Sequence, residues 1–247
     1  MKPLIGITCS FKPDGRGQTL TPAAYHDAVQ RAGGAPILLP PLEADEDIAE
    51  LLRRLDGLLL SGGPDINPVR YGEEKHEKTM LLAERREHFD LKMAAAAIAA
   101  GVPTLGVCLG AQEVNVACRG SLIQDIPSLC PGALVHAAPT SGGGETMHEV
   151  TIEQGSRLHR ILGVTRLSVN SSHHQAARQP GQRLKVCARC DDGIVEALEG
   201  DDESFVLAIQ WHPERIVDLP KQLDLFRALV DAARLRCRAA HARCGGG

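Results

Sequence analysis

The chain has 247 residues, a net charge of −4 and a hydrophobic share of 43%, enough for the core of one large α/β domain or two small ones. No cluster of lysine and arginine is long enough to predict a nucleic-acid interface, and the apolar runs are far too short to span a bilayer. The N-terminus lacks the apolar length and the cleavage site of a signal peptide. We therefore expect a soluble cytoplasmic protein that binds neither nucleic acid nor membranes.

The first half of the chain alternates short apolar strands with helices, which implies right-handed crossovers and a parallel sheet. Polar loops are expected at 10–17 and 64–79. The expected strands are 4–9, 36–40, 57–60 and 102–107, and the expected helices are 21–32, 45–55 and 84–100.

The second half changes to short strands with polar turns between them, which predicts a mixed or antiparallel arrangement. Its expected elements are strands at 122–126, 148–152, 167–169, 184–190, 194–198 and 205–210, a glycine-rich loop at 139–144 and a closing helix at 218–240. We predict one α/β domain over residues 1–240, with a mostly parallel central sheet and antiparallel additions in the C-terminal half. Residues 241–247 are expected to form a disordered tail.

Eight cysteines in a chain of this size do not predict a disulfide scaffold. Cys187 and Cys190 form a C-x-x-C pair within an expected strand. Residues i and i+3 of a strand face opposite sides, which argues against shared metal ligation. Because no second C-x-x-C or spaced histidine pair completes a zinc site, the sequence predicts no metal and no cofactor.

The stretch 102–112 predicts a reactive cysteine. An apolar strand enters a Gly-x-Cys-x-Gly turn centred on Cys108, and a helix-compatible segment runs from 111 to about 118. This is the nucleophile-elbow pattern with an exposed central side chain, and it needs Gly106 and Gly110 because a Cβ there would collide with a neighbouring strand or helix. The helix start favours the thiolate. A small buried cysteine is the alternative, and the elbow context favours the nucleophile.

A cysteine nucleophile needs a base and a group that orients the base. His212 and Glu214 lie two residues apart after the apolar strand that ends near 210. In an extended segment this spacing places both side chains on one face, so the carboxylate can fix the tautomer of the imidazole. The hypothesis is a Cys108–His212–Glu214 triad, and the alternative is a surface histidine near a turn.

Two further stretches suit acyl chemistry on an amino-acid-like ligand. Gly62 and Gly63 follow a buried strand and can direct N–H groups into the cleft at the carboxyl edge of the sheet, with the amide of Leu109 as the second oxyanion donor. The polar segment 170–175 contains Ser172, His173 and His174, which suit a ligand with an amine and a carboxylate. An ordinary turn and a solvated loop are the respective alternatives.

Together these motifs resemble the class I glutamine amidotransferase superfamily, and more closely its gamma-glutamyl-gamma-aminobutyrate hydrolase branch, grouped with the C26 peptidases. The resemblance covers nearly the whole chain. The cysteine elbow and the His-Pro-Glu ending are superfamily-wide. The G-G-x-D-x-x-P-x-x-Y-G-E loop from Gly62 and the N-S-x-H-H-Q segment from Asn170 point to this branch. Further matching segments are 3–8, 86–90 and 120–126.

The resemblance implies a flavodoxin-like three-layer sandwich. It also implies a cysteine that is acylated by a gamma-glutamyl group with release of an amine, after which water hydrolyses the thioester to glutamate. By the same resemblance, Cys108 is the nucleophile, His212 the base and later the acid, and Glu214 the residue that orients it. Four further residues would contact the oxyanion or the glutamyl group: Gly63, Leu109, Gln112 and His174.

Two departures from the branch leave the leaving amine open. The branch usually has arginine directly after the nucleophile, whereas this chain has Leu109, and in this it resembles amidotransferase glutaminase subunits. Residues 118–120 replace a segment that is usually richer in glycine. Both positions are expected near the cleft. The first hypothesis is a stand-alone hydrolase of gamma-glutamyl-GABA or a related small gamma-glutamyl-amine, which the long 64–79 loop favours because it can cover the cleft.

The second hypothesis is a glutaminase subunit that delivers ammonia to a separate synthase, and the third is a catalytically silent binding protein. The intact Cys108, His212 and Glu214 argue against the third. The sequence leaves a homodimer open.

Overall fold

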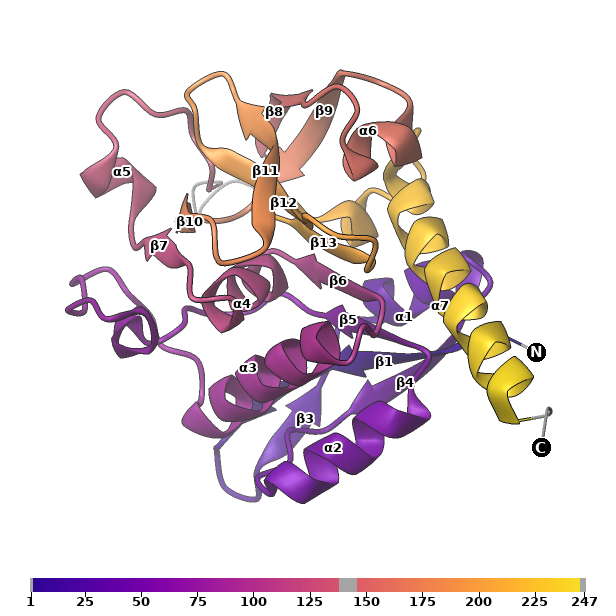
Figure 1. The fold of residues 1–247 in the computed structure, drawn as a ribbon. Coiled ribbons are helices and arrows are strands. Elements are labelled where there is room, and N and C mark those ends of the chain that lie inside the picture. Colours follow the sequence, from indigo (N-terminus) through magenta and orange to yellow (C-terminus); the bar gives the residue numbers. More distant parts are fainter. Residues whose placement is uncertain (1, 138–145, 245–247) are drawn as a thin grey trace.

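A nine-stranded sheet forms the centre of the computed structural model, which describes residues 2–137 and 146–244 (Figure 1). The strand order is β4-β1-β5-β6-β13-β12-β11-β8-β9. The parallel part consists of β4 (Ala35–Leu39), β1 (Leu4–Thr8), β5 (Gly57–Leu60), β6 (Thr104–Val107) and β13 (Val206–Ile209). The antiparallel additions are β12 (Val195–Gly200), β11 (Leu184–Cys190), β8 (Thr146–Ile152) and β9 (Arg166–Ser171). This confirms the predicted sheet, with its antiparallel strands in the C-terminal half.

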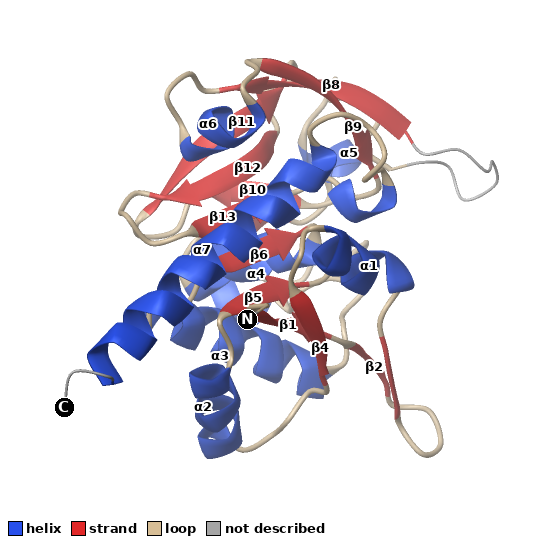
Figure 2. Cartoon of the chain, turned by 90° about the vertical axis from the view of Figure 1, so that its right-hand side faces the viewer, coloured by secondary structure: helices blue, strands red, loops and turns tan. Residues whose placement is uncertain are grey.

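Helices cover both faces of the sheet and complete three layers (Figure 2). One face packs against α1 (Ala23–Arg31), α6 (Arg157–Leu162) and α7 (Gln222–Cys244), and the other against α2 (Asp45–Arg54), α3 (Glu84–Ala99) and α4 (Leu109–Ala117). Strand β5 shows why both faces are covered. Leu59 packs in the cluster that contains Phe226, whereas Leu58 and Leu60 pack in the cluster that contains Phe89, because successive side chains of a strand point to opposite faces.

The expected loop at 10–17 instead forms the first strand and the turn of a hairpin. The hairpin pairs β2 (Ser10–Lys12) with β3 (Gln18–Leu20). These strands have only three residues each and bury little, so no apolar alternation marks them. The remaining short elements are η1 (Pro68–Tyr71), β7 (Ser121–Ile123), α5 (Ile126–Leu129), β10 (Ala176–Gln179) and η2 (Pro213–Arg215). Strand β7 pairs with β10 outside the main sheet, which the sequence did not predict.

Strand β4 was expected to be buried, and this was wrong. It lies at the edge of the sheet, where Ile37 and Leu38 are 41% and 45% exposed. Helix α7 runs to Cys244, four residues beyond its expected end at Ala240. The expected glycine-rich loop at 139–144 and residues 245–247 of the expected tail lie outside the described residues.

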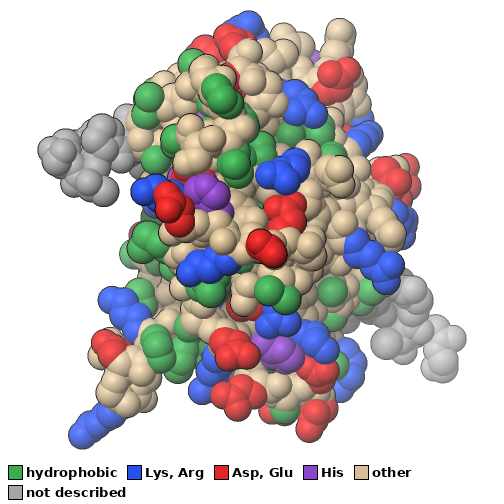
Figure 3. Space-filling model, turned by 90° about the vertical axis from the view of Figure 1, so that its left-hand side faces the viewer, with side chains coloured by type: hydrophobic (Ala, Val, Ile, Leu, Met, Phe, Trp, Pro, Cys, Tyr) green, Lys and Arg blue, Asp and Glu red, His purple; other side chains and the backbone are tan. Residues whose placement is uncertain are grey.

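No helix in the described part of the chain is long and apolar enough to cross a membrane. On the face shown in Figure 3, basic and acidic side chains are intermixed rather than separated into large patches.

Candidate active site

Cys108 occupies a sharp turn between the end of β6 and the start of α4. Its backbone has φ 55° and ψ −107°, a conformation that a residue with a Cβ adopts only under strain. Its N–H donates to the carbonyl of Ile209 in β13 (2.8 Å), which fixes the turn against the neighbouring strand. The predicted elbow is therefore present. The expectation of an exposed side chain was wrong, because Cys108 is only 6% exposed.

The two glycines that flank Cys108 are required by backbone contacts. A Cβ on Gly106 would lie 2.4 Å from the carbonyl oxygen of Gly110. A Cβ on Gly110 would lie 2.2 Å from the carbonyl oxygen of Leu60 in β5. Backbone atoms of a helix or a sheet cannot move aside as a flexible side chain can, so only glycine at these positions lets α4 approach the strands this closely.

His212 and Glu214 form a buried pair after β13. The Nδ1 of His212 lies 2.7 Å from the Oε1 of Glu214, and both residues are 3% exposed. Pro213–Arg215 is a turn of 3₁₀ helix rather than an extended segment, so the predicted geometric reason for the pairing was wrong although the pair forms. Asn170 holds the backbone of His212 by accepting from its N–H (3.1 Å) and donating to its carbonyl (3.0 Å).

Gly62 lies against both His212 and Cys108. A Cβ on Gly62 would be 3.0 Å from the Cε1 of His212 and 3.6 Å from the Cβ of Cys108. Burial lowers the pKa of His212, but the negative charge of Cys108, a hydrogen bond to its sulfur and the Glu214 carboxylate outweigh burial and raise the pKa to about 10. The histidine is therefore positively charged at neutral pH, and an imidazolium beside the sulfur stabilises a thiolate.

The turn at Gly62 and Gly63 is held by Arg86, a fully buried residue of α3. The guanidinium of Arg86 donates to the carbonyls of Ser61 (3.2 Å) and Gly62 (3.0 Å). In a trans peptide the N–H points opposite to the preceding carbonyl, so the N–H groups of Gly62 and Gly63 point away from Arg86. The N–H of Gly62 donates to the Tyr25 hydroxyl (2.9 Å), which leaves Gly63 as the better placed oxyanion donor.

Comparisons with known proteins identify the family to which this arrangement belongs. The sequence profile of Peptidase C26 matches residues 3–214. The chain belongs to the peptidase C26 family. It is 35% identical over 219 residues to a gamma-glutamyl-gamma-aminobutyrate hydrolase of Escherichia coli (86% of this chain, 85% of the relative). It is also 35% identical over 223 residues to protein NtpR of Enterococcus hirae (87% and 92%). These findings confirm the predicted resemblance and support a glutamine-amidotransferase-like hydrolase.

Solved structures of low sequence identity share the fold of this C26 protein. A glutamine amido transferase from Methylobacillus flagellatus superposes with a TM-score of 0.58 at 18% identity, covering 96% of this chain and 94% of that chain. At 18% identity the likeness shows the fold alone, and it supports the predicted flavodoxin-like α/β sandwich.

Two residues that contact the Gly62 turn were missed by site reasoning from the sequence, Arg86 and Tyr25. Arg86 forms a buried ion pair with Asp90 (2.9 Å). The carboxylate of Asp90 balances the charge of the guanidinium that holds the Gly62 turn. Burial and the nearby negative charges of Glu214 and Cys108 raise the pKa of Tyr25 well above its ordinary value, so its hydroxyl stays neutral. Arg86 and Asp90 lie in the segment 86–90, which matches the family, and this match could have marked Arg86 from the sequence. Nothing local marks Tyr25.

Leu109 and Gln112 lie in the first turns of α4, where the sequence placed them. The amide of Leu109 is in the first helical turn, whose N–H groups have no partner within the helix. Its side chain packs against Ile66 and Leu82, and its Cδ2 would lie 2.8 Å from a Cβ on Gly63. Gln112 was expected to contact a ligand, but its Nε2 donates to the Gln175 carbonyl (3.3 Å) and the Gln210 side chain (3.2 Å).

The predicted ligand segment 170–175 divides into inward and outward side chains. Ser172 is exposed, whereas His173 is buried against Glu196. His174 lies between two carboxylates, with Nε2 3.1 Å from Asp65 and Nδ1 3.0 Å from Asp125. Hydrogen bonding to Asp65 is the main cause that raises the pKa of His174, to about 9.

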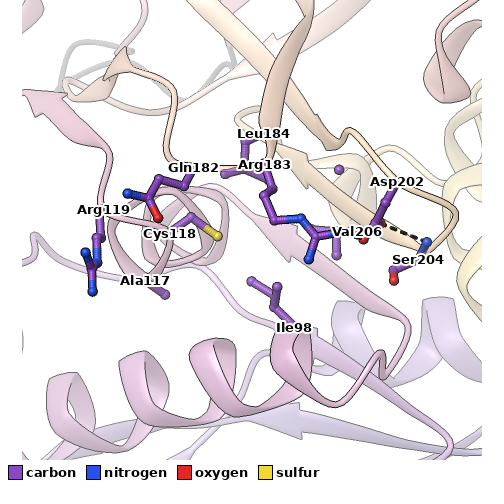
Figure 4. Close-up of a pocket in the computed structure, with 11 residues that line it drawn as sticks. Ile98, Ala117, Cys118, Arg119, Gln182, Arg183, Leu184, Asp202, Ser204 and Val206 are labelled. Atoms are coloured by element: carbon purple, nitrogen blue, oxygen red, sulfur yellow. Dashed lines mark hydrogen bonds and ion pairs between the residues drawn. The ribbon is translucent and has the colours of Figure 1, made fainter.

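A pocket of about 170 Å³ lies at the opposite end of α4 from Cys108 (Figure 4). The sulfur of Cys118 points into it, next to Gln182 and Arg183. A nine-residue helix is about 13 Å long, so Cys118 and Arg119 cannot line the Cys108 site. The expectation that residues 118–120 lie near the cleft was therefore wrong.

Proposed function

We propose that this C26 protein is a cysteine hydrolase that cleaves the gamma-glutamyl amide bond of gamma-glutamyl-GABA or a related gamma-glutamyl-amine. The observation that carries the proposal is the buried His212–Glu214 pair next to the strained Cys108 at the start of α4. The name of the E. coli relative, a gamma-glutamyl-gamma-aminobutyrate hydrolase, supports the substrate class.

Acylation begins when the Cys108 thiolate attacks the side-chain carbonyl carbon of the gamma-glutamyl group. The oxyanion that forms accepts hydrogen bonds from the amides of Leu109 and Gly63, whose orientation Arg86 fixes from below. His212 then donates its proton to the departing amine nitrogen, and the C–N bond breaks to leave a glutamyl thioester. Glu214 keeps the imidazole in the required orientation throughout.

Deacylation uses the same groups in reverse. His212, now neutral, accepts a proton from a water molecule as the water attacks the thioester carbonyl. The tetrahedral intermediate collapses, the carbon–sulfur bond breaks, and glutamate leaves with the thiolate and imidazolium restored. His212 therefore acts as an acid in acylation and as a base in deacylation, so activity requires it to be protonated in the first step and neutral in the second.

The free ends of the glutamyl group are assigned to the rim that contains His174. Asp65 follows Gly62 by three residues, so the two Cα atoms are at most about 11 Å apart. The His174 ring bonds Asp65 and Asp125, so it is tied to the segment that directly follows the Gly62–Gly63 turn. Its side chain is 31% exposed and positively charged, which suits the substrate carboxylate, while the two aspartates suit the amino group.

A second function, glutaminase activity for a separate synthase partner, is favoured by Leu109. This apolar side chain is 1% exposed and packs under the segment that contains Ile66 and Leu82, so it offers no charge to an amine leaving group. Glutamine, whose leaving group is ammonia, requires no such contact.

The test is release of amine and glutamate by the purified protein from gamma-glutamyl-GABA, other gamma-glutamyl-amines and glutamine. Turnover of one gamma-glutamyl-amine that is lost in Cys108→Ala and retained in Cys118→Ser would support the hydrolase. The two cysteines lie at opposite ends of α4, so the second variant controls for loss of a thiol. Turnover of glutamine alone would support the glutaminase subunit. Turnover of any substrate at the wild-type rate by Cys108→Ala would overturn the mechanism.

A further inference from the structure

A second group of buried, chemically reactive side chains lies in the antiparallel half of the sheet. Its members come from separate segments: His148 is in β8, Cys190 in β11 and Glu196 in β12, while His136 follows α5. All four are buried, and one ligand atom from each lies within 4.8 Å of the others. The roles of Cys108, His212 and Glu214 in the proposed reaction do not use this group.

One oxygen of Glu196 is at the centre of the group. Its Oε1 lies 3.3 Å from the Nδ1 of His136, 3.5 Å from the Nε2 of His148 and 3.5 Å from the Sγ of Cys190. In a tetrahedral zinc site with bonds of 2.0–2.3 Å, ligand atoms are about 3.3–3.8 Å apart. Three contacts of the group therefore have the edge lengths of such a site already.

The contacts around His136 call for a proton or a cation between its Nδ1 and Glu196. Its Nε2 lies 2.9 Å from the carboxylate of Asp192, which can only accept, so this nitrogen has the proton. In the neutral imidazole the Nδ1 is then a lone pair, and it faces the Oε1 of Glu196. Two lone pairs at 3.3 Å repel each other unless a proton or a cation lies between them.

Several polar atoms of the group have no hydrogen-bond partner. They include the Nδ1 of His136, both ring nitrogens of His148 and the Oε2 of Glu196. Buried polar atoms in native proteins nearly always have a partner, and two of these nitrogens, Nδ1 of His136 and Nε2 of His148, converge on one oxygen of Glu196, as ligand atoms around an ion do. Imidazole, thiolate and carboxylate are together the donor types that bind divalent transition metals.

We propose that His136, His148, Cys190 and Glu196 form a structural metal site for a divalent transition-metal ion, with Zn²⁺ as the best suited. Binding forms four bonds to the ion and releases the thiol proton of Cys190 to solvent. Two neutral imidazoles, one thiolate, one carboxylate and Zn²⁺ sum to zero charge, which suits a buried site. Four protein ligands close the coordination sphere, as in structural rather than catalytic zinc sites.

Neighbouring residues provide the supporting contacts that metal sites use. Asp192 accepts from the second nitrogen of His136, an arrangement typical of a histidine that ligates zinc. His173 contacts the same oxygen of Glu196, with Nε2 3.3 Å from Oε1, and its Nδ1 lies 2.9 Å from the carbonyl of Gln175. A pocket of about 280 Å³ that is lined in part by His136 and His173 provides access for the ion.

The site would stabilise the elements that hold the triad histidine. Glu196 accepts at its backbone carbonyl from the N–H of Gln210, two residues before His212. Asn170, in the strand that pairs with the His148 strand, makes two hydrogen bonds to the backbone of His212. The metal would therefore link β8, β11 and β12 to the segment that positions His212, while it makes no contact with substrate.

The experiment uses full-length Cys108→Ala protein, so that the reactive cysteine cannot bind the probe. The chelator-treated protein is titrated with CoCl₂ and, separately, with ZnCl₂. We expect one ion per chain, a near-ultraviolet thiolate-to-cobalt charge-transfer band, a zinc Kd in the nanomolar range or tighter, and a Tm increase of about 5 °C or more at saturating zinc.

Two further variants in the same background locate the ion. Cys108→Ala/Cys190→Ser should lose the charge-transfer band and weaken zinc binding at least about 10-fold, and the matched Cys108→Ala/Cys118→Ser control should keep both. Fewer than about 0.2 equivalents of zinc bound by the Cys108→Ala protein would overturn the proposal, and this readout does not depend on the folding of any further variant. A band that persists without Cys190 would also overturn it. These readouts do not measure turnover, so they stand apart from the proposed reaction.

Discussion

The protein contains two buried groups of histidine and carboxylate, and they differ in what lies beside them. Next to His212 and Glu214 lies Cys108, a sulfur on a strained turn at the start of a helix. The His212 imidazole there has the Cys108 sulfur and the Glu214 carboxylate as partners. Beside Glu196 lie His136 and His148, whose inward nitrogens both face the same carboxylate oxygen at 3.3 and 3.5 Å. The first group is complete without a ligand, and the second is completed by a cation.

The positions of the two groups in the sheet explain this difference. Cys108 lies at the carboxyl end of β6, in the parallel half, where strands give way to turns and N–H groups are available. Glu196 lies within β12, in the antiparallel half, at a register shift of the pairing with β11; its backbone carbonyl accepts from Gln210, and its side chain is the group that meets the two histidines. Catalysis therefore suits the first position, and ligation by side chains suits the second.

The largest expected effect is on Cys108 itself. Cys108→Ala removes the nucleophile and should lower kcat by a factor of at least about 10⁴, because the oxyanion donors and binding contacts alone provide only a residual rate. The substitution removes a single sulfur atom at a turn on the edge of the core, so the Tm should change by only a few degrees. Steady-state kinetics and circular dichroism melting measure the two quantities. Retained turnover in a well-folded variant would contradict the assignment.

The next effect separates the base from the residue that orients it. His212→Ala should lower kcat by about 10⁴-fold or more, and Glu214→Gln by about 10²–10⁴-fold, because the glutamine leaves the imidazole present but less well held. Glu214→Gln should also lower the pKa of His212 from about 10, since one cause of the increase is removed. The pH dependence of kcat/KM measures this change. A larger loss in Glu214→Gln than in His212→Ala would reverse the roles.

A smaller effect is expected from the glycine that touches both catalytic side chains. Gly62→Ala places a methyl group 3.0 Å from His212 and 2.8 Å from the Tyr25 hydroxyl, so these side chains must shift. We expect a loss in kcat of about 10²-fold, the cost of a small misplacement in an active site. Gly200→Ala is the matched control, because its Cβ would have no neighbour closer than 3.4 Å. An equal kcat for Gly62→Ala and Gly200→Ala would argue against the position of the Gly62 turn beside His212 and Cys108.

The smallest effect concerns His174, which lies next to His173 in sequence but bonds Asp65 and Asp125 instead of Glu196. Folding raises its pKa from about 6.5 to about 9, so this pairing stabilises the protein fully below pH 6.5 and less as the pH rises through 9. His174→Gln should therefore flatten the decrease in unfolding free energy between pH 7 and 9.5. Urea unfolding at several pH values measures it, with His159→Gln as a control on α6. An unchanged slope in His174→Gln would exclude the pairing.

The cysteine elbow and the His212–Glu214 pair were predictable because the determinants of each are local in sequence. Gly106 and Gly110 flank Cys108 within five residues, and His212 and Glu214 are two residues apart, so spacing alone indicated their proximity. The reason given for the last pair was nevertheless wrong, because Pro213 begins a 3₁₀ turn instead of continuing the strand. Local spacing can indicate that two residues meet without giving the backbone geometry that brings them together.

The candidate metal group could not be predicted in this way. Its residues span 136 to 196 in the sequence and follow no recurring spacing. The two cysteines of the C-x-x-C pair contact different residues. Cys190 contacts Glu196, while Cys187 lies near Glu199. The expectation that the two sulfurs do not share a metal agrees with this separation. The prediction of no metal considered only closely spaced motifs, whereas the proposed site takes its residues from separate segments.

The sequence by itself determined the alternation of strands and helices and the cysteine elbow, because apolar periodicity and close glycine contacts act over a few residues. Its motifs carried the resemblance to the family and to the sandwich fold. Only the tertiary structure decided that Cys108 is buried, that Arg86 fixes the Gly62 turn from a different helix, and that four distant side chains meet around Glu196. Those contacts depend on the order in which strands are arranged in the sheet. Strand order is set by the packing of the whole chain, and no segment contains it alone.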